Sequence, residues 1–205
     1  MKVTDSPAEL LELLRHRDPE ACARCVQEHW DGLYRLALRI LKDPQEAEDT
    51  VQETFLNAFR NIDTFQGRSS IGTWLFRIAY NTALMRLRKT HRETVSVEGS
   101  DSGDGEGEPL ELFDFSNLPE EEVLNREVQD QIQAAIQDAP SNLRTVFALR
   151  EVEGLSTAET AEVLGLSEEA VKTRLHRGRL WLRQRLSRYF AERERLAGDK
   201  PNGAR

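Results

Sequence analysis

The sequence is poor in cysteine and in aromatic residues, and it has no long apolar run. Its 205 residues include two cysteines, Cys22 and Cys25, which are too few for a disulfide framework. No stretch approaches the roughly 18 consecutive apolar residues of a membrane-spanning helix. The N-terminus lacks an apolar core followed by a small-residue cleavage site, so no signal peptide is expected. These features predict a cytoplasmic protein.

Acidic residues are missing from two parts of a chain whose formal net charge is -8. Residues 68–92 contain six Arg or Lys and no Asp or Glu, and residues 172–195 contain nine basic residues against two acidic ones. Residues 93–138, which lie between these two blocks, contain fourteen acidic residues and one Arg. This pattern predicts two polyanion-binding modules separated by an acidic connector.

Apolar residues recur with helical spacing through residues 8–91 and 119–195, and no convincing alternating strand is present. We expect an all-α protein with two small helical domains, at residues 1–93 and 119–190, and a tail at 191–205. Residues 94–118 are rich in Gly, Ser, Asp and Glu, which predicts a flexible linker. Two interpretations of its acidic run remain open: mimicry of nucleic acid, and a solubilising tether without a specific role.

The stretch "GLSTAETAEVLGLSEEAVKTRLHRGR" predicts a helix-turn-helix. Ser156 and Glu159 form a capping-box pattern, and Gly165 suits a left-handed helix end. Ser167 then caps a second helix, which starts with two glutamates. Helices joined by so short a turn are typical of DNA-binding units, in which the second helix enters the major groove.

The second helix of this unit is expected to bury Ala170, Val171 and Leu175 and to present a basic outer face to DNA. The alternative is a solvated face, but arginines without interspersed glutamates repel one another. The candidate duplex-contacting residues are Glu169, Lys172, Thr173, Arg174, His176, Arg177 and Arg179.

The stretch "KDPQEAEDTVQETFLNAFRNI" predicts a helix capped by Asp43, with Pro44 in its first turn and Glu46 closing a capping box. Its inner face contains Ala47, Val51, Thr54, Phe55 and Ala58. The opposite face contains the candidate partner-binding residues Asp49, Gln52, Glu53 and Leu56. From the pattern alone, an ordinary solvated face is the more common explanation.

The stretch "TFQGRSSIGTWLFRIAYNTALMRLRK" combines a Gly/Ser turn with a helix that Ser69 or Ser70 caps. Aromatic and basic side chains alternate along it, which suits single-stranded nucleic acid. Trp74 alone is better explained by core packing. The candidate nucleic-acid contacts are Phe65, Arg68, Ser69, Ser70, Arg77, Tyr80, Asn81 and Arg88.

The segments "DPQEAEDTVQETFLNAFRNIDTFQGRSSIGTWLFRIAYNTA" and "LREVEGLSTAETAEVLGLSEEAVKTRLHRGR" closely resemble the extracytoplasmic-function sigma factors of bacterial RNA polymerase. The resemblance covers about residues 18–92 and 119–190. It implies two helical domains, region 2 and region 4, and a function in promoter-specific transcription initiation without enzymatic activity of its own.

The resemblance also implies partners and roles for the candidate residues. Asp49, Gln52 and Glu53 would bind the β′ clamp helices of core polymerase, which reverses the preference for a solvated face. Arg68, Ser69 and Ser70 would lie near the loop that captures a flipped −10 base, with Tyr80 and Asn81 on the −10 reading helix. Region 4 would read the −35 element, with the β flap as a second polymerase contact, and an anti-sigma factor would cover the polymerase-binding faces.

Two alternatives are less consistent with the sequence. A stand-alone helix-turn-helix regulator would need neither the acidic face nor the aromatic and basic helix. A zinc or redox site at His16, Cys22, Cys25 and His29 has suitable residue types, but free cysteines more often act as small buried hydrophobes. We therefore expect no metal and no cofactor.

Overall fold

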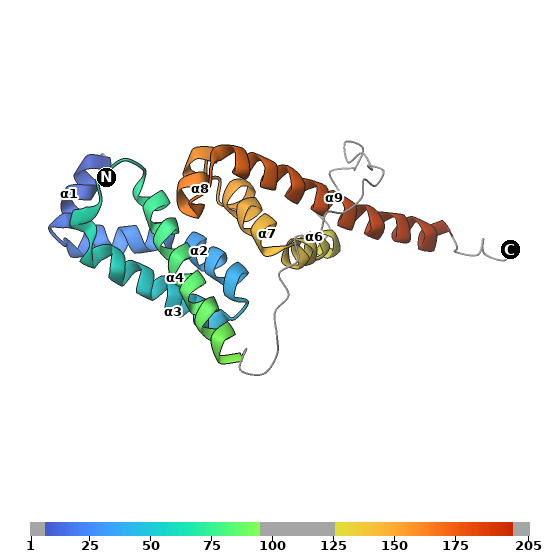
Figure 1. Ribbon diagram of the computed structural model, residues 1–205, viewed down its shortest axis with the longest axis horizontal. Helices are drawn as coiled ribbons and strands as arrows, with labels where there is room; N and C mark the ends of the chain where they lie inside the picture. The colour runs from blue at the N-terminus through green and yellow to red at the C-terminus, as the bar shows by residue number, and fades with distance from the viewer. Residues whose placement is uncertain (1–6, 95–125, 199–205) are drawn as a thin grey trace. The chain divides into compact units, whose positions relative to one another are not determined.

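The computed structural model describes residues 7–94 and 126–198, and in these ranges it consists of helices without a strand (Figure 1). The N-terminal elements are α1 (Pro7–Arg15), α2 (Pro19–Leu41), α3 (Pro44–Arg60), the 3-10 turn η1 (Ile62–Thr64) and α4 (Ile71–Thr94). The C-terminal elements are α6 (Arg126–Asp138), α7 (Ser141–Phe147), the π-helical segment η3 (Ala148–Val152), α8 (Thr157–Leu164) and α9 (Glu168–Gly198). The all-α prediction is confirmed.

The described helices fall into two compact units. The first contains α1 to α4 together with η3, α8 and the first residues of α9 as far as Lys172. The second contains α6, α7 and the rest of α9. The predicted domain limits at residues 93 and 119 stay a prediction, and most of the predicted linker lies outside the described residues. Helix α9 continues to Gly198, past the predicted domain end at residue 190.

Local capping explains where α2, α3 and α4 begin. The Asp18 carboxylate accepts a hydrogen bond from the Ala21 amide at 2.9 Å, and Asp43 accepts one from the Glu46 amide at the same distance. Ser70 Oγ accepts from the Thr73 amide at 3.0 Å, so Ser70 is the cap of α4. Each of these caps satisfies a backbone donor that has no partner inside its own helix.

The connection between α2 and α3 is only two residues long. Lys42 ends α2 in the left-handed conformation, with φ of 61°, and Asp43 then caps α3. A connection this short makes the two helices antiparallel neighbours. Helices α2, α3 and α4 each pack against the other two, as Figure 1 shows.

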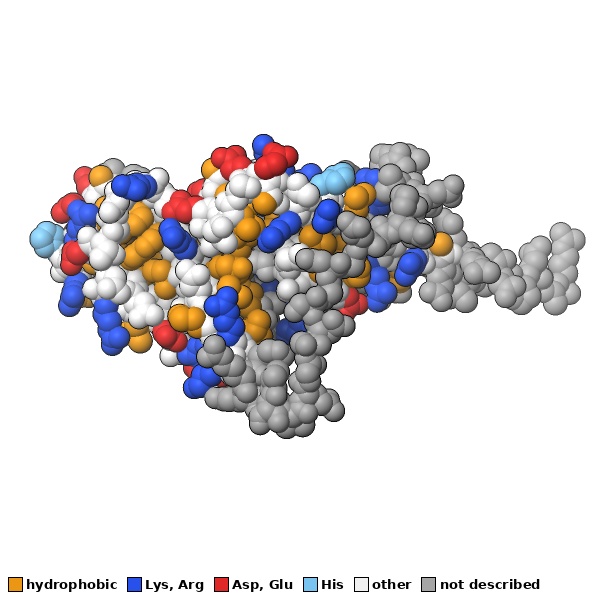
Figure 2. All heavy atoms as spheres, viewed as in Figure 1, with side chains coloured by type: hydrophobic (Ala, Val, Ile, Leu, Met, Phe, Trp, Pro, Cys, Tyr) orange, Lys and Arg blue, Asp and Glu red, His pale blue; other side chains and the backbone are white. Residues whose placement is uncertain are grey.

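The core of the first unit is built from the inner faces of these helices. The predicted inner residues of α3 are all buried, as are Leu33 and Leu36 on α2 and Leu75 on α4. Val163 of α8 and Leu149 of η3 belong to the same cluster. On the face shown in Figure 2, charged side chains of both signs are scattered over this unit, with hydrophobic side chains between them.

The second unit is held by contacts between α6 and α9. The Trp181 indole donates a hydrogen bond to the Ala135 carbonyl at 3.2 Å, and Arg185 forms an ion pair with Asp138 at 2.9 Å. Leu186 and Phe190 are buried and pack with Ile132.

Candidate functional site

The outer face of α3 has the composition expected of a partner-binding surface. Leu56 is 55% exposed although it is a large apolar residue, and Gln52 is also exposed. Asp49 and Glu53 are half-buried. This face lies opposite the buried inner face of α3, as the helical spacing predicts.

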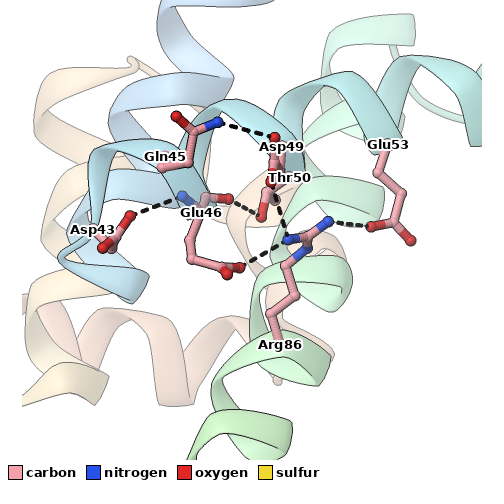
Figure 3. Close-up of polar contacts among 7 residues, drawn as sticks. All are labelled: Asp43, Gln45, Glu46, Asp49, Thr50, Glu53 and Arg86. Atoms are coloured by element: carbon pink, nitrogen blue, oxygen red, sulfur yellow. Dashed lines mark hydrogen bonds and ion pairs between the residues drawn. The ribbon is translucent and has the colours of Figure 1, made fainter.

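Asp49 and Glu53 belong to an ion-pair network that the sequence did not reveal (Figure 3). Arg86 of α4 donates from Nη1 to Glu46 Oε2 at 2.8 Å and from Nη2 to Glu53 Oε2 at 2.9 Å. Its Nη1 also lies 3.9 Å from Asp49 Oδ2. These hydrogen bonds raise the pKa of the Arg86 guanidinium. One guanidinium faces three carboxylates, so the network remains negative.

The prediction for Glu46 is half right. Its amide binds the Asp43 side chain as expected, but the helix is not closed by a reciprocal capping box. The Glu46 carboxylate instead binds Arg86. The hydrogen-bonded ion pair with Arg86 replaces the return bond to the backbone, because a charged donor binds a carboxylate more strongly than a neutral amide does.

The loop before α4 contains three of the predicted nucleic-acid contacts. Gly67 has φ of 69°, which a residue with a side chain rarely adopts. Arg68 and Ser70 are exposed, and Ser69 is half-buried. The loop therefore presents one exposed cation, Arg68, and one exposed serine, Ser70.

Phe65 precedes this loop and is not accessible in the structure. It is 6% exposed, and its ring centroid lies 5.1 Å from that of Trp74, which is half-buried. The sequence favoured a core position for Trp74 and a contact role for Phe65, yet both rings pack together. Phe65 could contact nucleic acid only after leaving the core.

Two of the hydroxyls around the start of α4 bind glutamates of α8. Ser69 Oγ donates to Glu162 at 3.0 Å, and Thr73 Oγ1 donates to Glu159 at 2.9 Å. Hydrogen bonds from Ser156 and from Thr73 lower the pKa of the Glu159 carboxyl. These contacts were missed, because nothing local in the sequence links α8 to the loop before α4.

The exposed side of α4 contains the remaining candidates of this group. Arg77, Asn81 and Arg88 are exposed and lie on one stripe of the helix, at spacings of four and seven residues. Tyr80 is half-buried and packs against the core. The stripe is polar and basic, which suits contact with a nucleic-acid backbone.

The turn between α8 and α9 has the predicted geometry. Ser156 and Glu159 form a complete capping box, Gly165 is left-handed with φ of 65°, and Ser167 Oγ accepts from the Ala170 amide at 3.2 Å. Val171 is fully buried and Leu175 is 8% exposed. The predicted helix-turn-helix is therefore present.

The predicted outer residues of α9 are accessible. Arg174 is half-buried, and the others are exposed: Glu169, Lys172, Thr173, His176, Arg177 and Arg179. Lys172 Nζ lies 3.8 Å from Glu169 Oε2, with both side chains well exposed. Such a pair contributes little, so Lys172 is free to contact another group.

Glu153 is a buried acidic residue that sequence reasoning also missed. Its side chain is 4% exposed and binds Arg35 at 2.6 Å and Arg39 at 3.4 Å. The hydrogen bond raises the pKa of Arg35, whereas burial lowers the pKa of Arg39 in spite of its partner. The available signal was the pair of arginines four residues apart beside the apolar stripe of α2.

The cysteines are placed as core residues. Cys25 is 2% exposed, and burial, with the neighbouring Glu28 and Cys22, raises the pKa of its thiol to about 12. Cys22 is half-buried. Within residues 7–94 and 126–198, no three His, Cys, Asp or Glu side chains are grouped so that they could hold a metal ion. In the same ranges, none of the helices combines the length and the apolar character that crossing a membrane requires.

The structure combines helical packing, a helix-turn-helix, and separate acidic and basic faces. These features together define a class of protein that binds DNA and a protein partner. Comparison with family models supports this class. Residues 25–93 match Sigma-70 region 2, and residues 129–182 match Sigma-70 region 4.

Individual relatives agree with the family models. The chain is 35% identical over 176 residues to the ECF RNA polymerase sigma factor SigW of Bacillus subtilis, covering 86% of this chain and 94% of the relative. It is 33% identical to the RNA polymerase sigma-H factor of Pseudomonas aeruginosa, and the match covers 87% of this chain and 93% of that relative.

Solved structures share the fold. CnrH, in complex with the cytosolic domain of CnrY, matches with a TM-score of 0.60 and 24% identity over 89% of this chain and 98% of that chain. The sigma factor RpoE of Bartonella quintana, in complex with the anti-sigma factor NepR, matches with a TM-score of 0.61 and 22% identity. This match covers 80% of this chain and 96% of that chain.

The chain belongs to the ECF sigma factors of the sigma-70 family. It is a sigma factor that binds core RNA polymerase and directs promoter-specific transcription initiation, and the alternative of a stand-alone regulator is not favoured.

Proposed function

We propose that the outer face of α3 is the surface that binds the β′ clamp helices of core polymerase. The supporting observation is that this face combines half-buried carboxylates at Asp49 and Glu53 with an exposed Leu56. Apolar and negatively charged groups side by side suit a partner with basic and apolar side chains, because complementary charge sets orientation and raises the association rate. Gln52 lies exposed on the same face and adds a neutral donor and acceptor.

The loop before α4 and the exposed stripe of α4 are proposed to bind the −10 element. Arg68 and Ser70 in the loop and Arg77, Asn81 and Arg88 on the helix supply cations, hydroxyls and an amide to one strand. Ser69 belongs to this group through its position beside Arg68. Phe65 is left out because its ring is buried.

The N-terminal turns of α9 are proposed to enter the major groove at the −35 element. Lys172, Thr173 and His176 are exposed in the part of the helix whose side chains reach base edges. Arg177 and Arg179 follow along the helix and are suited to phosphate contacts.

An anti-sigma factor is a further proposed partner. Two solved structures with a similar fold are complexes, one with the cytosolic domain of CnrY and one with the anti-sigma factor NepR. The exposed Leu56 beside acidic side chains is the kind of surface that an inhibitor competing with polymerase would cover.

Charge reversal on α3 tests the polymerase-binding assignment. The double substitution Asp49→Lys and Glu53→Lys should reduce retention of core polymerase more than tenfold, because like charges placed opposite one another cost several kcal/mol. The measurement is a pull-down or a titration of the full-length protein with purified core enzyme.

A matched control makes the same change in charge elsewhere in the first unit. Asp31→Lys with Asp63→Lys reverses two exposed carboxylates outside α3 and should leave core binding close to that of the native protein. Circular dichroism confirms that both variants are helical. Retention of polymerase by a folded Asp49→Lys, Glu53→Lys variant at the native level would refute the assignment.

A further inference from the structure

Arg86 is less exposed than the α3 carboxylates that it contacts. Its side chain is 27% exposed, whereas those of Glu46, Asp49 and Glu53 are between 43% and 47% exposed. Figure 3 shows the guanidinium reaching from α4 toward α3, with Glu46 and Glu53 on either side of it. The carboxylates are therefore more accessible to a partner of α3 than the arginine is.

The network leaves the outer oxygens of these carboxylates available. Glu46 and Glu53 each bind Arg86 through Oε2, so Oε1 of each accepts no hydrogen bond from the guanidinium. Asp49 is held from the other side, because Gln45 Nε2 donates to its Oδ1 at 3.3 Å. The arginine can stay in place while cationic side chains of a partner bind the acidic face.

We propose that Arg86 is a positioning residue for polymerase binding: it holds the Glu46 and Glu53 carboxylates in one geometry on α3, ready for the basic partner. This inference rests on the proposed function of the α3 face. Two flexible glutamates that are ordered before binding lose less conformational freedom on binding, and preorganisation of this kind strengthens a complex.

The competing explanation is that Arg86 only neutralises charge. The two explanations predict opposite changes in the affinity for core polymerase when Arg86 is removed. If Arg86 were a charge shield, its removal would make the face more negative and tighten binding to a basic partner. If Arg86 positions the glutamates, its removal weakens binding even though the long-range attraction increases.

Arg86→Gln in the full-length protein separates these outcomes. We expect about three- to tenfold weaker binding to core polymerase. A loss of this size corresponds to the free-energy cost of ordering two flexible side chains on binding. The loss should appear in a faster dissociation rate, with an association rate that is unchanged or slightly raised. Arg86→Lys should fall between the native protein and Arg86→Gln, because an ammonium lacks the planar fork that bridges two carboxylates.

A charge-matched control is available on the same helix. Lys89 is exposed and lies outside the network, so Lys89→Gln removes one positive charge from α4 without touching α3. It should leave the dissociation rate of core polymerase unchanged. An equal effect of Lys89→Gln and Arg86→Gln would show that net charge alone matters, and the proposal would fail.

A double-mutant cycle tests whether Arg86 acts through the glutamates. In the background Glu46→Gln, Glu53→Gln, the substitution Arg86→Gln should have almost no further effect on the dissociation rate. A full additional effect would mean that Arg86 contacts polymerase directly. Tighter or unchanged binding by Arg86→Gln alone would also overturn the proposal, and Arg86→Lys provides the same comparison if Arg86→Gln does not fold.

The two assignments fail separately. If Asp49→Lys with Glu53→Lys leaves polymerase binding intact, the α3 face is not the interface. If that variant loses binding while Arg86→Gln does not, the interface stands and only the positioning role of Arg86 is wrong.

Discussion

His29 on α2 packs so closely against the first turn of α4 that a side chain on Gly72 would lie 3.2 Å from its Cε1. Burial lowers the pKa of the imidazole, and the nearby Glu28 carboxylate opposes this in part. The folded protein therefore favours the neutral ring. One side chain makes the stability of the first unit depend on pH near neutrality.

The sign of this dependence follows from proton uptake. Because the pKa of His29 is lower in the folded state, the unfolded chain binds the proton more readily below about pH 6.5. The contribution of His29 to stability is complete above that pH and is lost as the pH falls through the folded-state value. We expect urea midpoints to fall between pH 7.5 and pH 5.5, and to fall less in His29→Gln. Equal pH dependence in both proteins would contradict this prediction.

Cys25 shows the same effect of burial on a thiol. With a pKa of about 12, its thiol stays protonated at neutral pH and is a poor nucleophile and a poor metal ligand. The sequence placed Cys22 and Cys25 on one helical face but could not measure their burial. The packing around α2 favours the core interpretation.

At the scale of the element, α9 combines two kinds of contact along one helix. Val171 and Leu175 in its first turns are buried, whereas Lys172 and Thr173 between them are exposed. Lys172 and Thr173 lie near its N-terminus, whereas Arg183 lies three turns later and is half-buried. Side chains at the start of such a helix reach base edges, and later ones meet phosphates.

Substitutions at these positions should have different effects. Lys172→Ala or Thr173→Ala should change the preferred −35 sequence, with about 1–3 kcal/mol of discrimination lost per base contact. Arg183→Ala should weaken binding to all sequences alike. It should also reduce the steepness with which the logarithm of the binding constant falls with the logarithm of the salt concentration, by about one unit. Binding of polymerase holoenzyme to a library of −35 variants at several salt concentrations measures both. An unchanged preference order in the first two variants would show that these turns do not read bases.

Local signals at this scale were predicted well, because each depends on residues close together in the chain. The Ser156–Glu159 capping box, the left-handed Gly165 and the Ser167 cap all appear as expected. The Glu46 carboxylate was not predicted correctly, because its contact depends on a residue far away in the chain. Its backbone follows the local pattern, but its carboxylate is taken by Arg86, forty residues away.

At the scale of the whole molecule, the Glu153 cluster joins distant parts of the first unit. Glu153 follows η3, and its partners Arg35 and Arg39 are on α2. A Cβ on Gly32 would lie 3.0 Å from Glu153 Oε2 and 3.1 Å from the Phe76 ring, so a larger residue at this position would crowd the cluster. The carboxylate and Arg39 are both largely removed from water.

Breaking this cluster should be costly. Glu153→Ala leaves the buried Arg39 without its charged partner and should lower the free energy of unfolding by about 3 kcal/mol. Replacing both residues, as in Glu153→Leu with Arg39→Leu, removes two buried charges together and should cost less. Urea unfolding of the two variants gives the comparison. A double variant that loses at least as much stability as Glu153→Ala would contradict this account.

The amino-acid sequence by itself determined the helices, their caps, the helix-turn-helix and the family, because these depend on spacing and neighbouring residues. It also determined which face of α3 is buried, since helical periodicity follows directly from the order of apolar residues. Only the tertiary structure decided that Phe65 is buried against Trp74, that Arg86 holds Glu46 and Glu53, and that Glu153 binds Arg35 and Arg39. Each of these joins side chains on different elements, and charge or aromatic character alone does not specify which partner a side chain will meet.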